Sequence, residues 1–182
     1  MKTVCVPLAP GFEEIEAVTI IDVLRRAGIT VVVAGTEPGP IRGSHGIAIT
    51  PDTTVGEVDA ETLDMVALPG GMPGTLKLRD SPAVRALLAR LSSRGRYTAA
   101  ICAAPTVLAA EGLLDGKRAT SHPSVREQLE LAGVAYREDA VVEDGAVVTS
   151  RGAGTAMAFA LRLVSLLTDD ETAARLRSAM VA

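Results

Sequence analysis

The sequence has no tryptophan and few aromatic side chains, which argues against several classes of protein. Among its 182 residues, only Phe12, Phe159, Tyr97 and Tyr136 carry a phenyl or phenol ring, so few rings are available for nucleic-acid bases to stack on. Acidic side chains outnumber basic ones by 22 to 18, for a net charge of −4, and this balance provides no basic surface for phosphates. We therefore expect no nucleic-acid partner.

The sequence also lacks a long uninterrupted apolar run. The longest such run, residues 99–110, is interrupted by Pro105 and falls short of the roughly 18 apolar residues of a membrane-spanning helix. No signal peptide is visible, so we expect no membrane partner and a cytoplasmic location. In that compartment Cys5 and Cys102 are expected to be thiols rather than a disulfide.

Several motifs of cofactor and metal chemistry are missing as well. The chain has no G-x-G-x-x-G at a strand–helix turn, no P-loop and no C-x-x-C. It has no group of histidine, cysteine and carboxylate at metal-ligand spacing. We therefore expect no cofactor and no metal ion.

What the sequence does contain is an alternation of β-rich and helical segments. Hydrophobic residues make up 48% and charged residues 22%, so the chain can bury a large core, and its length fits one domain over residues 1–182. Between the β-rich runs, apolar residues recur at helical spacing, as at Ala17, Ile20, Ile21 and Leu24. This alternation predicts an α/β fold with a mostly parallel sheet covered on both faces. The expected strands are residues 3–8, 30–34, 63–68, 97–101, 118–121 and 147–150.

Local signals mark where several elements begin or turn. Ser81 and Pro82 predict the start of a helix, and Thr168 opens a capping-box pattern that predicts the start of the last one. Glycines and prolines over residues 37–51 predict a hairpin, and residues 143–146 predict a tight turn.

Reactive side chains follow four of the expected strands. This placement matters because ligands of open parallel sheets bind beyond the carboxyl ends of the strands. The candidates are three glutamates after the first strand, two glycines after the third, a cysteine after the fourth and a histidine after the fifth: Glu13, Glu14, Glu16, Gly70, Gly71, Cys102 and His122.

Cys102 is the most informative of these residues. The segment A-I-C-A-A-P places it between a strand and a helix, with Ala100 and Ala104 two positions away on either side. A nucleophile elbow needs such small neighbours, and a helix N-terminus favours thiolate and lowers the thiol pKa. A buried core cysteine is equally consistent with the spacing alone. Cys5, between two valines in a strand, is expected to be inert core.

The three glutamates after the first strand have two interpretations. Acidic side chains in a first helical turn are favoured by the helix dipole without any further role, and at least two of Glu13, Glu14 and Glu16 are expected to be surface residues. A carboxyl group that faced the Cys102 thiol would have a raised pKa and act as a proton shuttle.

The glycines and histidines also have structural alternatives. Gly70 and Gly71 predict either backbone N–H groups that face an oxyanion or a tight turn. His122 is either a base or hydrogen-bond partner near Cys102 or a structural residue at a strand end. His45 is expected to be a loop residue.

Six motifs, occurring in this order along nearly the whole chain, together resemble the ThiJ/PfpI superfamily, and within it the branch of the parkinsonism-associated protein "DJ-one". The resemblance implies a flavodoxin-like, three-layer domain related to class I glutamine amidotransferases, usually a homodimer. It also implies a reactive Cys102 at the elbow, hydrogen-bonded to Glu16. The motifs are G-F-E-E-I-E-A-V (11–18), L-R-R-A-G (24–28), L-P-G-G (68–71), A-I-C-A-A-P-T (100–106), S-H-P (121–123) and T-S-R-G-A-G-T (149–155).

The resemblance implies a cofactor-independent glyoxalase III or deglycase that acts on methylglyoxal, related dicarbonyls or their adducts. In this hypothesis Cys102 attacks the aldehyde, Gly71 and Ala103 N–H groups stabilise the oxyanion, Glu16 moves the proton and His122 orders the pocket. One alternative is a redox sensor or chaperone in which Cys102 is oxidised to sulfinate. Another is a homologue with a different substrate.

Two positions depart from patterns of the superfamily. The protease branch has a histidine directly after the cysteine, where this chain has Ala103, so peptidase activity is not expected. Many members of the closer branch carry an arginine in the loop where this chain reads G-S-H-G (residues 43–46), so the anion contact that such an arginine makes across the dimer is not expected here. For the dimer, Ile15 and Val18 lie off the expected core face of the first helix and are available to a second copy.

Overall fold

The computed structural model describes residues 1–182 and contains a seven-stranded sheet as its central layer. Neighbouring strands are parallel except for the antiparallel pair at one edge, so the predicted mostly parallel α/β fold is confirmed. From that edge to the other, the order is β10 (Val141–Asp144), β11 (Val147–Ser150), β7 (Tyr97–Ile101), β6 (Met65–Leu68), β1 (Thr3–Leu8), β2 (Thr30–Gly35) and β5 (Thr53–Thr54).

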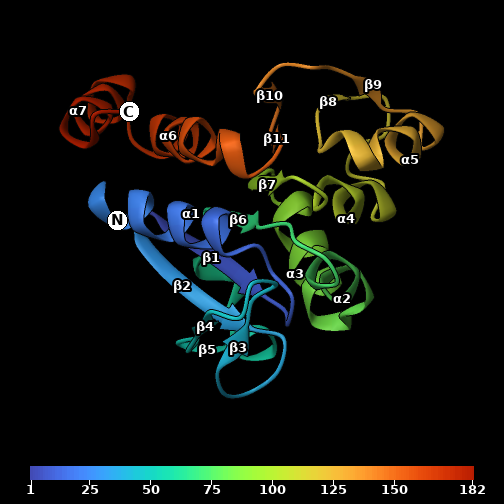
Figure 1. Ribbon diagram of the computed structural model, residues 1–182, viewed down its shortest axis with the longest axis horizontal. Helices are drawn as coiled ribbons and strands as arrows, with labels where there is room; N and C mark the ends of the chain where they lie inside the picture. The colour runs from blue at the N-terminus through green and yellow to red at the C-terminus, as the bar shows by residue number, and fades with distance from the viewer.

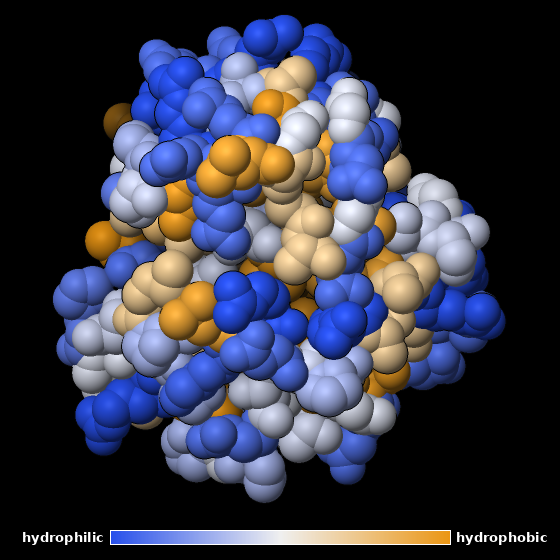
Figure 2. All heavy atoms as spheres, turned by 90° about the vertical axis from the view of Figure 1, so that its right-hand side faces the viewer, coloured by the Kyte–Doolittle hydropathy of each residue, from blue (hydrophilic) through white to orange (hydrophobic).

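Helices cover both faces of this sheet. On one face α1 (Glu14–Arg26) lies beside α6 (Ala156–Leu167), with α7 (Asp170–Met180) packed against α6 (Figure 1). The opposite face carries α2 (Gly74–Asp80), α3 (Pro82–Ser93), α4 (Pro105–Ala110) and α5 (Arg126–Leu131). On the side of the molecule that Figure 2 shows, apolar side chains are scattered among hydrophilic ones. None of the helices has the length and apolar character needed to cross a membrane.

Each face of the sheet has its own hydrophobic core. Alternate residues of a strand point to opposite faces, so Val4 and Val6 of β1 join the core under α1 and α6, whereas Cys5 joins the other. Phe12 and Phe159 are fully buried in the first core. Cys5 is fully buried in the second, as predicted for an inert core thiol.

Two smaller sheets and four short 3₁₀ turns lie in the connections. The hairpin expected within residues 37–51 is present as the antiparallel strands β3 (Ile41–Arg42) and β4 (Ala48–Ile49). Strands β8 (Arg118–Ala119) and β9 (Ala135–Tyr136) form a parallel pair outside the main sheet. The 3₁₀ turns are η1 (Val55–Glu57), η2 (Ala60–Thr62), η3 (Pro123–Val125) and η4 (Ala153–Thr155).

Three of the six expected strands have the predicted limits, and a fourth, β2, ends one residue later than expected, at Gly35. The strands at residues 3–8, 97–101 and 147–150 are confirmed, and the turn at 143–146 joins β10 to β11. The strand expected at 118–121 ends at Ala119, because the Thr120 N–H donates to Thr149 Oγ1 (2.9 Å) instead of a neighbouring strand. The strand expected at 63–68 begins only at Met65.

The helix starts were predicted correctly in one case and one residue early in another. Ser81 caps α3, and its hydroxyl accepts a hydrogen bond from the Val84 N–H (3.4 Å). The last helix is capped by Asp169 rather than Thr168, since Asp169 Oδ1 accepts from the Thr172 N–H at 2.7 Å. A carboxylate at that position is also favoured by the helix dipole.

Candidate active site

Cys102 lies in a sharp turn between β7 and α4, at the carboxyl edge of the sheet. Its φ of +66° is in the left-handed region that non-glycine residues rarely adopt, as at a nucleophile elbow. The backbone is held on both sides: its N–H donates to Ser150 O (3.0 Å), and its carbonyl accepts from the His122 N–H (2.8 Å). The elbow conformation expected from the sequence is therefore present, and the side chain is half-buried.

Gly70 and Gly71 provide the space that this turn needs. A Cβ atom on Gly70 would lie 2.7 Å from Cys102 Cβ and 2.8 Å from Glu16 Oε2. Gly71 has a φ of +94°, and a Cβ there would lie 2.3 Å from the Glu13 backbone nitrogen. Any side chain at either position would push the glutamate segment away from the cysteine.

The backbone N–H groups near the sulfur have different partners. The Gly70 N–H donates to Glu16 Oε2 at 2.8 Å, so it is already engaged. The N–H groups of Ala103 and Gly71 interact with the Cys102 sulfur and act to lower its pKa. An oxyanion-binding role accordingly stays a prediction for Gly71 and Ala103, while Gly70 orients the carboxyl group.

Glu16 is the member of the acidic trio that faces the thiol. Its side chain is fully buried, and its Oε1 atom has no hydrogen-bond partner. Burial raises the pKa of this carboxyl group to about 7, against the opposing effects of the Gly70 N–H and the Cys102 thiol. At neutral pH the carboxyl group is therefore divided between its charged and protonated forms.

The pKa of the Cys102 thiol is raised rather than lowered, and the expectation from the helix N-terminus was wrong. Burial and the Glu16 carboxylate raise it to about 12, more than the Ala103 and Gly71 N–H groups lower it. Helix α4 begins only at Pro105 and has six residues, so its dipole lowers the pKa of the thiol only weakly. At neutral pH the resting pair is a thiol beside a carboxyl group that can take its proton.

His122 borders the elbow but does not hydrogen-bond to the thiol. Its ring is exposed, and Nδ1 accepts from the Ser124 N–H (3.2 Å) and bonds to Ser124 Oγ (2.8 Å). A Cβ on Gly152 would lie 3.5 Å from His122 Cδ2 and 4.0 Å from Cys102 Sγ. Both side chains thus face Gly152, and the hydrogen bonds of the His122 ring go to Ser124 rather than to the thiol, which favours a role in shaping the pocket over deprotonation of the thiol.

A second polar cluster lies where α1 meets the β3–β4 hairpin, and sequence spacing missed it. The buried Glu14 accepts from the His45 N–H (2.7 Å) and the Ile47 N–H (3.3 Å), and its Oε2 lies 3.0 Å from His45 Nδ1. Although burial opposes ionisation, hydrogen bonds from His45 and backbone N–H groups lower the pKa of Glu14 to about 2. In turn, Glu14 and Glu13 raise the pKa of His45.

This cluster has residue types that bind metals, although no metal site was expected. Candidate ligand atoms of Glu13, Glu14 and His45 lie within 4.8 Å of one another. The sequence separation of 31 residues between Glu14 and His45 concealed the grouping. Hydrogen bonds already occupy both Glu14 oxygens. These bonds hold the β3–β4 hairpin against α1, and this structural role explains why the three side chains lie together. Because Glu14 and Glu16 are both buried, the expectation that at least two of the three glutamates are surface residues was wrong.

Comparisons with known proteins point to one family. The sequence model described as the DJ-1/PfpI family matches residues 2–166. Protein dj-1beta of Drosophila melanogaster is 46% identical over 172 residues, which cover 93% of this chain and 91% of that protein. The glutathione-independent glyoxalase DJR-1.2 of Caenorhabditis elegans is 40% identical over 159 residues, covering 87% and 84%. The solved structure of oxidized Toxoplasma gondii DJ-1 has a TM-score of 0.94 at 40% identity, with 100% of this chain and 98% of that chain covered.

Limited alkylation should distinguish the two cysteines. Cys102 is half-buried at the elbow, whereas Cys5 is fully buried. Burial raises the pKa of both thiols to about 12, so access to the reagent decides which is labelled first. Brief treatment of the folded protein with iodoacetamide, followed by peptide mapping, is expected to label Cys102 first. Preferential labelling of Cys5 would contradict this assignment, and labelling in denaturant serves as the control in which both thiols react.

Replacing Glu16 by Gln should change how stability depends on pH. The folded pKa of about 7 lies above the ordinary value of 4.5, so the protonated carboxyl group contributes stability that is fully present below about pH 4.5 and is lost as pH rises through 7. The loss by pH 8 amounts to about 2 to 3 kcal/mol. Glu16→Gln has no such titration. As pH rises from 4.5 to 8, its free energy of unfolding is therefore expected to increase by that amount relative to that of the unsubstituted protein.

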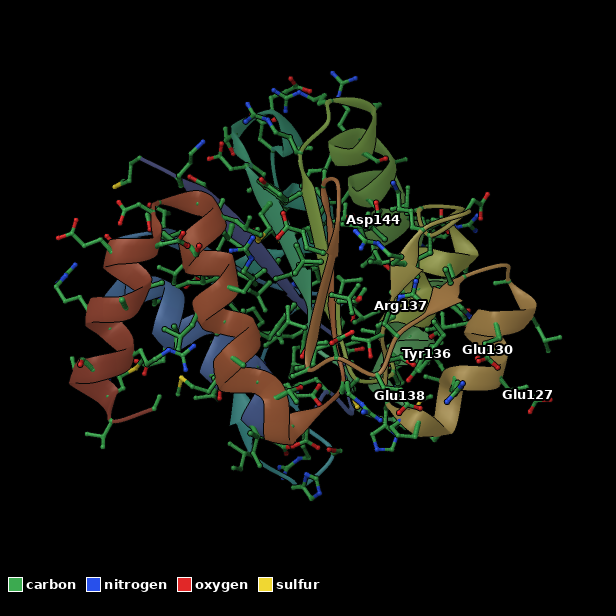
Figure 3. The ribbon with its side chains drawn as sticks, turned by 90° about the horizontal axis from the view of Figure 1, so that it is seen from above. Glu127, Glu130, Tyr136, Arg137, Glu138 and Asp144 are labelled. Carbon is green, nitrogen blue, oxygen red and sulfur yellow. The ribbon has the colours of Figure 1, made fainter.

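Urea unfolding at pH 4.5 and pH 8 measures this difference. The matched control is Glu127→Gln, because Glu127 is exposed on α5 at the outer edge of the molecule (Figure 3). If the difference between the Glu16→Gln and unsubstituted proteins were the same at both pH values, the raised pKa would be refuted.

Proposed function

Because this chain belongs to the DJ-1/PfpI family, we propose that it is a cofactor-independent glyoxalase that converts methylglyoxal and related dicarbonyls to hydroxy acids. The observation that carries the proposal is the buried Glu16 carboxyl group beside the Cys102 thiol, with a pKa near neutrality. The name of the nematode relative, glutathione-independent glyoxalase, supports the same activity.

The first step is addition of the sulfur to the aldehyde carbon. Because the thiol pKa is about 12 and the Glu16 pKa about 7, the thiol proton passes to the carboxylate as the carbon–sulfur bond forms. The aldehyde oxygen gains the negative charge of a hemithioacetal. The N–H groups of Gly71 and Ala103, which face the sulfur, stabilise that oxyanion.

The second step moves a proton between the two carbons of the substrate. Protonation of the oxyanion by Glu16 restores the carboxylate, which then removes the hydrogen from the former aldehyde carbon and returns it to the neighbouring carbon. The hydroxyl proton on the former aldehyde carbon passes to the ketone oxygen, so the hemithioacetal becomes a thioester and the ketone becomes a secondary alcohol. Water then cleaves the thioester, so methylglyoxal and water give lactate, and the Cys102 thiol is regenerated.

The same residues support an extension of this function to adducts. A thiol that adds to free dicarbonyls also adds to their adducts on amino groups or thiols, which would make the protein a deglycase. His122, whose ring is held by Ser124, orders the pocket. We place the activity in the cytoplasm, where two free cysteines remain reduced.

A redox-sensing or chaperone function is the second candidate. A protonated Glu16 would donate a hydrogen bond to an oxygen of a Cys102 sulfinate, and the buried Oε1 atom has no other partner. A similar solved structure is described as an oxidized form. The two functions differ in stoichiometry: peroxide modifies a sensor once, whereas an enzyme converts many equivalents of dicarbonyl.

We further propose that the protein acts as a homodimer. Ile15 and Val18 of α1 are 58% and 47% exposed, and Ile47 of the neighbouring hairpin loop is 58% exposed. Glu14 joins these two segments by accepting from the N–H groups of the loop. The three apolar side chains therefore belong to one rigid unit that is suited to pack against a second copy.

Lactate production tests the enzyme. Purified protein with methylglyoxal is expected to form many equivalents of lactate. Cys102→Ala should reduce production to the buffer background, and Glu16→Gln should lower kcat by about 100-fold or more. Cys5→Ser is the matched control and should retain activity. Less than one equivalent of lactate per chain would refute turnover, and loss of activity in EDTA with recovery on adding a metal would refute a metal-free mechanism.

Light scattering tests the dimer. At micromolar concentration the measured mass is expected to be about twice the 18.8 kDa chain mass. The double variant Ile15→Glu/Val18→Glu is expected to have the mass of one chain, because its added charges would be buried in the interface. Leu131→Glu is the control, since Leu131 is 82% exposed on α5. A monomeric unsubstituted protein, or a double variant that remains a dimer, would contradict the proposal.

A further inference from the structure

A hollow of about 480 Å³ adjoins Cys102 at the carboxyl edge of the sheet. Its lining consists of His122, Pro123 and residues 151–155. Gly152 connects the hollow to the elbow, because a Cβ atom at this position would be 4.0 Å from Cys102 Sγ. A molecule in the hollow would therefore reach the sulfur past a residue that has no side chain.

Strand register places Arg151 in this hollow, next to the nucleophile. Strands β11 and β7 are parallel, and Ser150 pairs with Ile101. The next residue of each strand is Arg151 in one case and Cys102 in the other. Both follow carboxyl ends of neighbouring parallel strands, where ligands of such sheets bind.

The guanidinium group of Arg151 is held in place by a hydrogen bond, but its charge is not neutralised. Its Nη1 donates to the backbone carbonyl of Glu138 at 2.9 Å; Glu138 follows β9, near Tyr136 and Arg137 (Figure 3). No carboxylate lies within ion-pair distance of Arg151, whereas Arg126 and Arg162 each pair with a carboxylate. A neutral carbonyl fixes the guanidinium group and leaves its positive charge and other N–H groups available.

His122 adds a hydrogen-bond donor to the same hollow. Since its Nδ1 accepts from the Ser124 N–H, the proton of the neutral ring is on Nε2. Nε2 is bonded to Cδ2, the ring atom that would lie 3.5 Å from a Cβ on Gly152. The donor side of the ring thus borders the hollow.

A larger hollow elsewhere provides a contrast. It measures about 540 Å³, lies among β10, α6 and α7, and also contains an arginine, Arg162. There Glu143 pairs with Arg162, and the lining also holds Arg177 and a second carboxylate, Asp170, so its two cations are matched by two anions. The lining of the smaller hollow beside Cys102, in contrast, contains Arg151 and no carboxylate.

We propose that Arg151 and His122 form a subsite for a carboxylate or phosphate group of a carbonyl substrate whose carbonyl carbon is attacked by Cys102. This inference rests on the proposed function and adds to its substrates a preferred class, carbonyl compounds that carry an oxyanion. A guanidinium group binds the two oxygens of such an anion with parallel hydrogen bonds. Arg151 is thereby a specificity-determining residue, and Cys102 and Glu16 remain the reacting groups.

Protection of Cys102 from alkylation tests the subsite without requiring turnover. Glyoxylate and glycolaldehyde are aldehydes of similar size, and each adds reversibly to a thiol, but only glyoxylate carries a carboxylate. In the unsubstituted protein, glyoxylate is expected to protect Cys102 from iodoacetamide at a concentration about tenfold lower than in Arg151→Gln. Protection by glycolaldehyde should be the same in both proteins. Arg151→Lys, which keeps the charge but not the paired donors, should fall between them.

The outcome is separable from that of the proposed function. If glyoxylate protects the unsubstituted protein and Arg151→Gln equally, the subsite is refuted, whatever the lactate assay gives. If lactate formation from methylglyoxal fails but Arg151 still determines the preference for glyoxylate, the glyoxalase proposal is refuted and the oxyanion subsite is supported. Acetate and inorganic phosphate, added as competitors, show which oxyanion binds more tightly.

Discussion

The burial of one carboxyl group, that of Glu16, against the Cys102 thiol is the constraint on which the rest of the site depends. A buried carboxylate is costly unless it is hydrogen-bonded, and here a single N–H, from Gly70, supplies that bond. The carboxyl group therefore holds its proton up to about pH 7. To bring it this close to the cysteine, both residues of the intervening turn must be glycine, because a Cβ at either one would collide with a neighbour.

Two glutamates in the same helical turn have opposite properties because their surroundings differ. Glu14 accepts hydrogen bonds from the N–H groups of His45 and Ile47 as well as from the His45 side chain, and its pKa falls to about 2. Glu16, two residues later, has one N–H donor and a sulfur neighbour, and its pKa rises to about 7. Glu14 thereby fixes the start of α1 against the hairpin, and this anchoring holds Glu16 in position.

The sequence was sufficient for features that depend on neighbouring residues. The β1 and β7 limits, the Ser81 cap and the elbow position of Cys102 follow from hydrophobic runs, capping residues and small neighbours, which are all local. Features set by distant contacts were missed. The contact between Glu14 and His45 spans 31 residues, and the direction of the thiol pKa shift depends on a carboxylate contributed by another strand–helix connection.

Because this chain has Ala103 rather than a histidine directly after Cys102, a carboxyl group has to serve as the base. Ala103 has no side-chain donor or acceptor, and the hydrogen bonds of the His122 ring go to Ser124. Glu16 is the one titratable side chain that interacts with the thiol, and a base with a pKa of about 7 is suited both to accept a proton and to return it at neutral pH. The thiol pKa of about 12 is then compatible with catalysis, because the sulfur loses its proton to Glu16 only as it bonds to the substrate carbon.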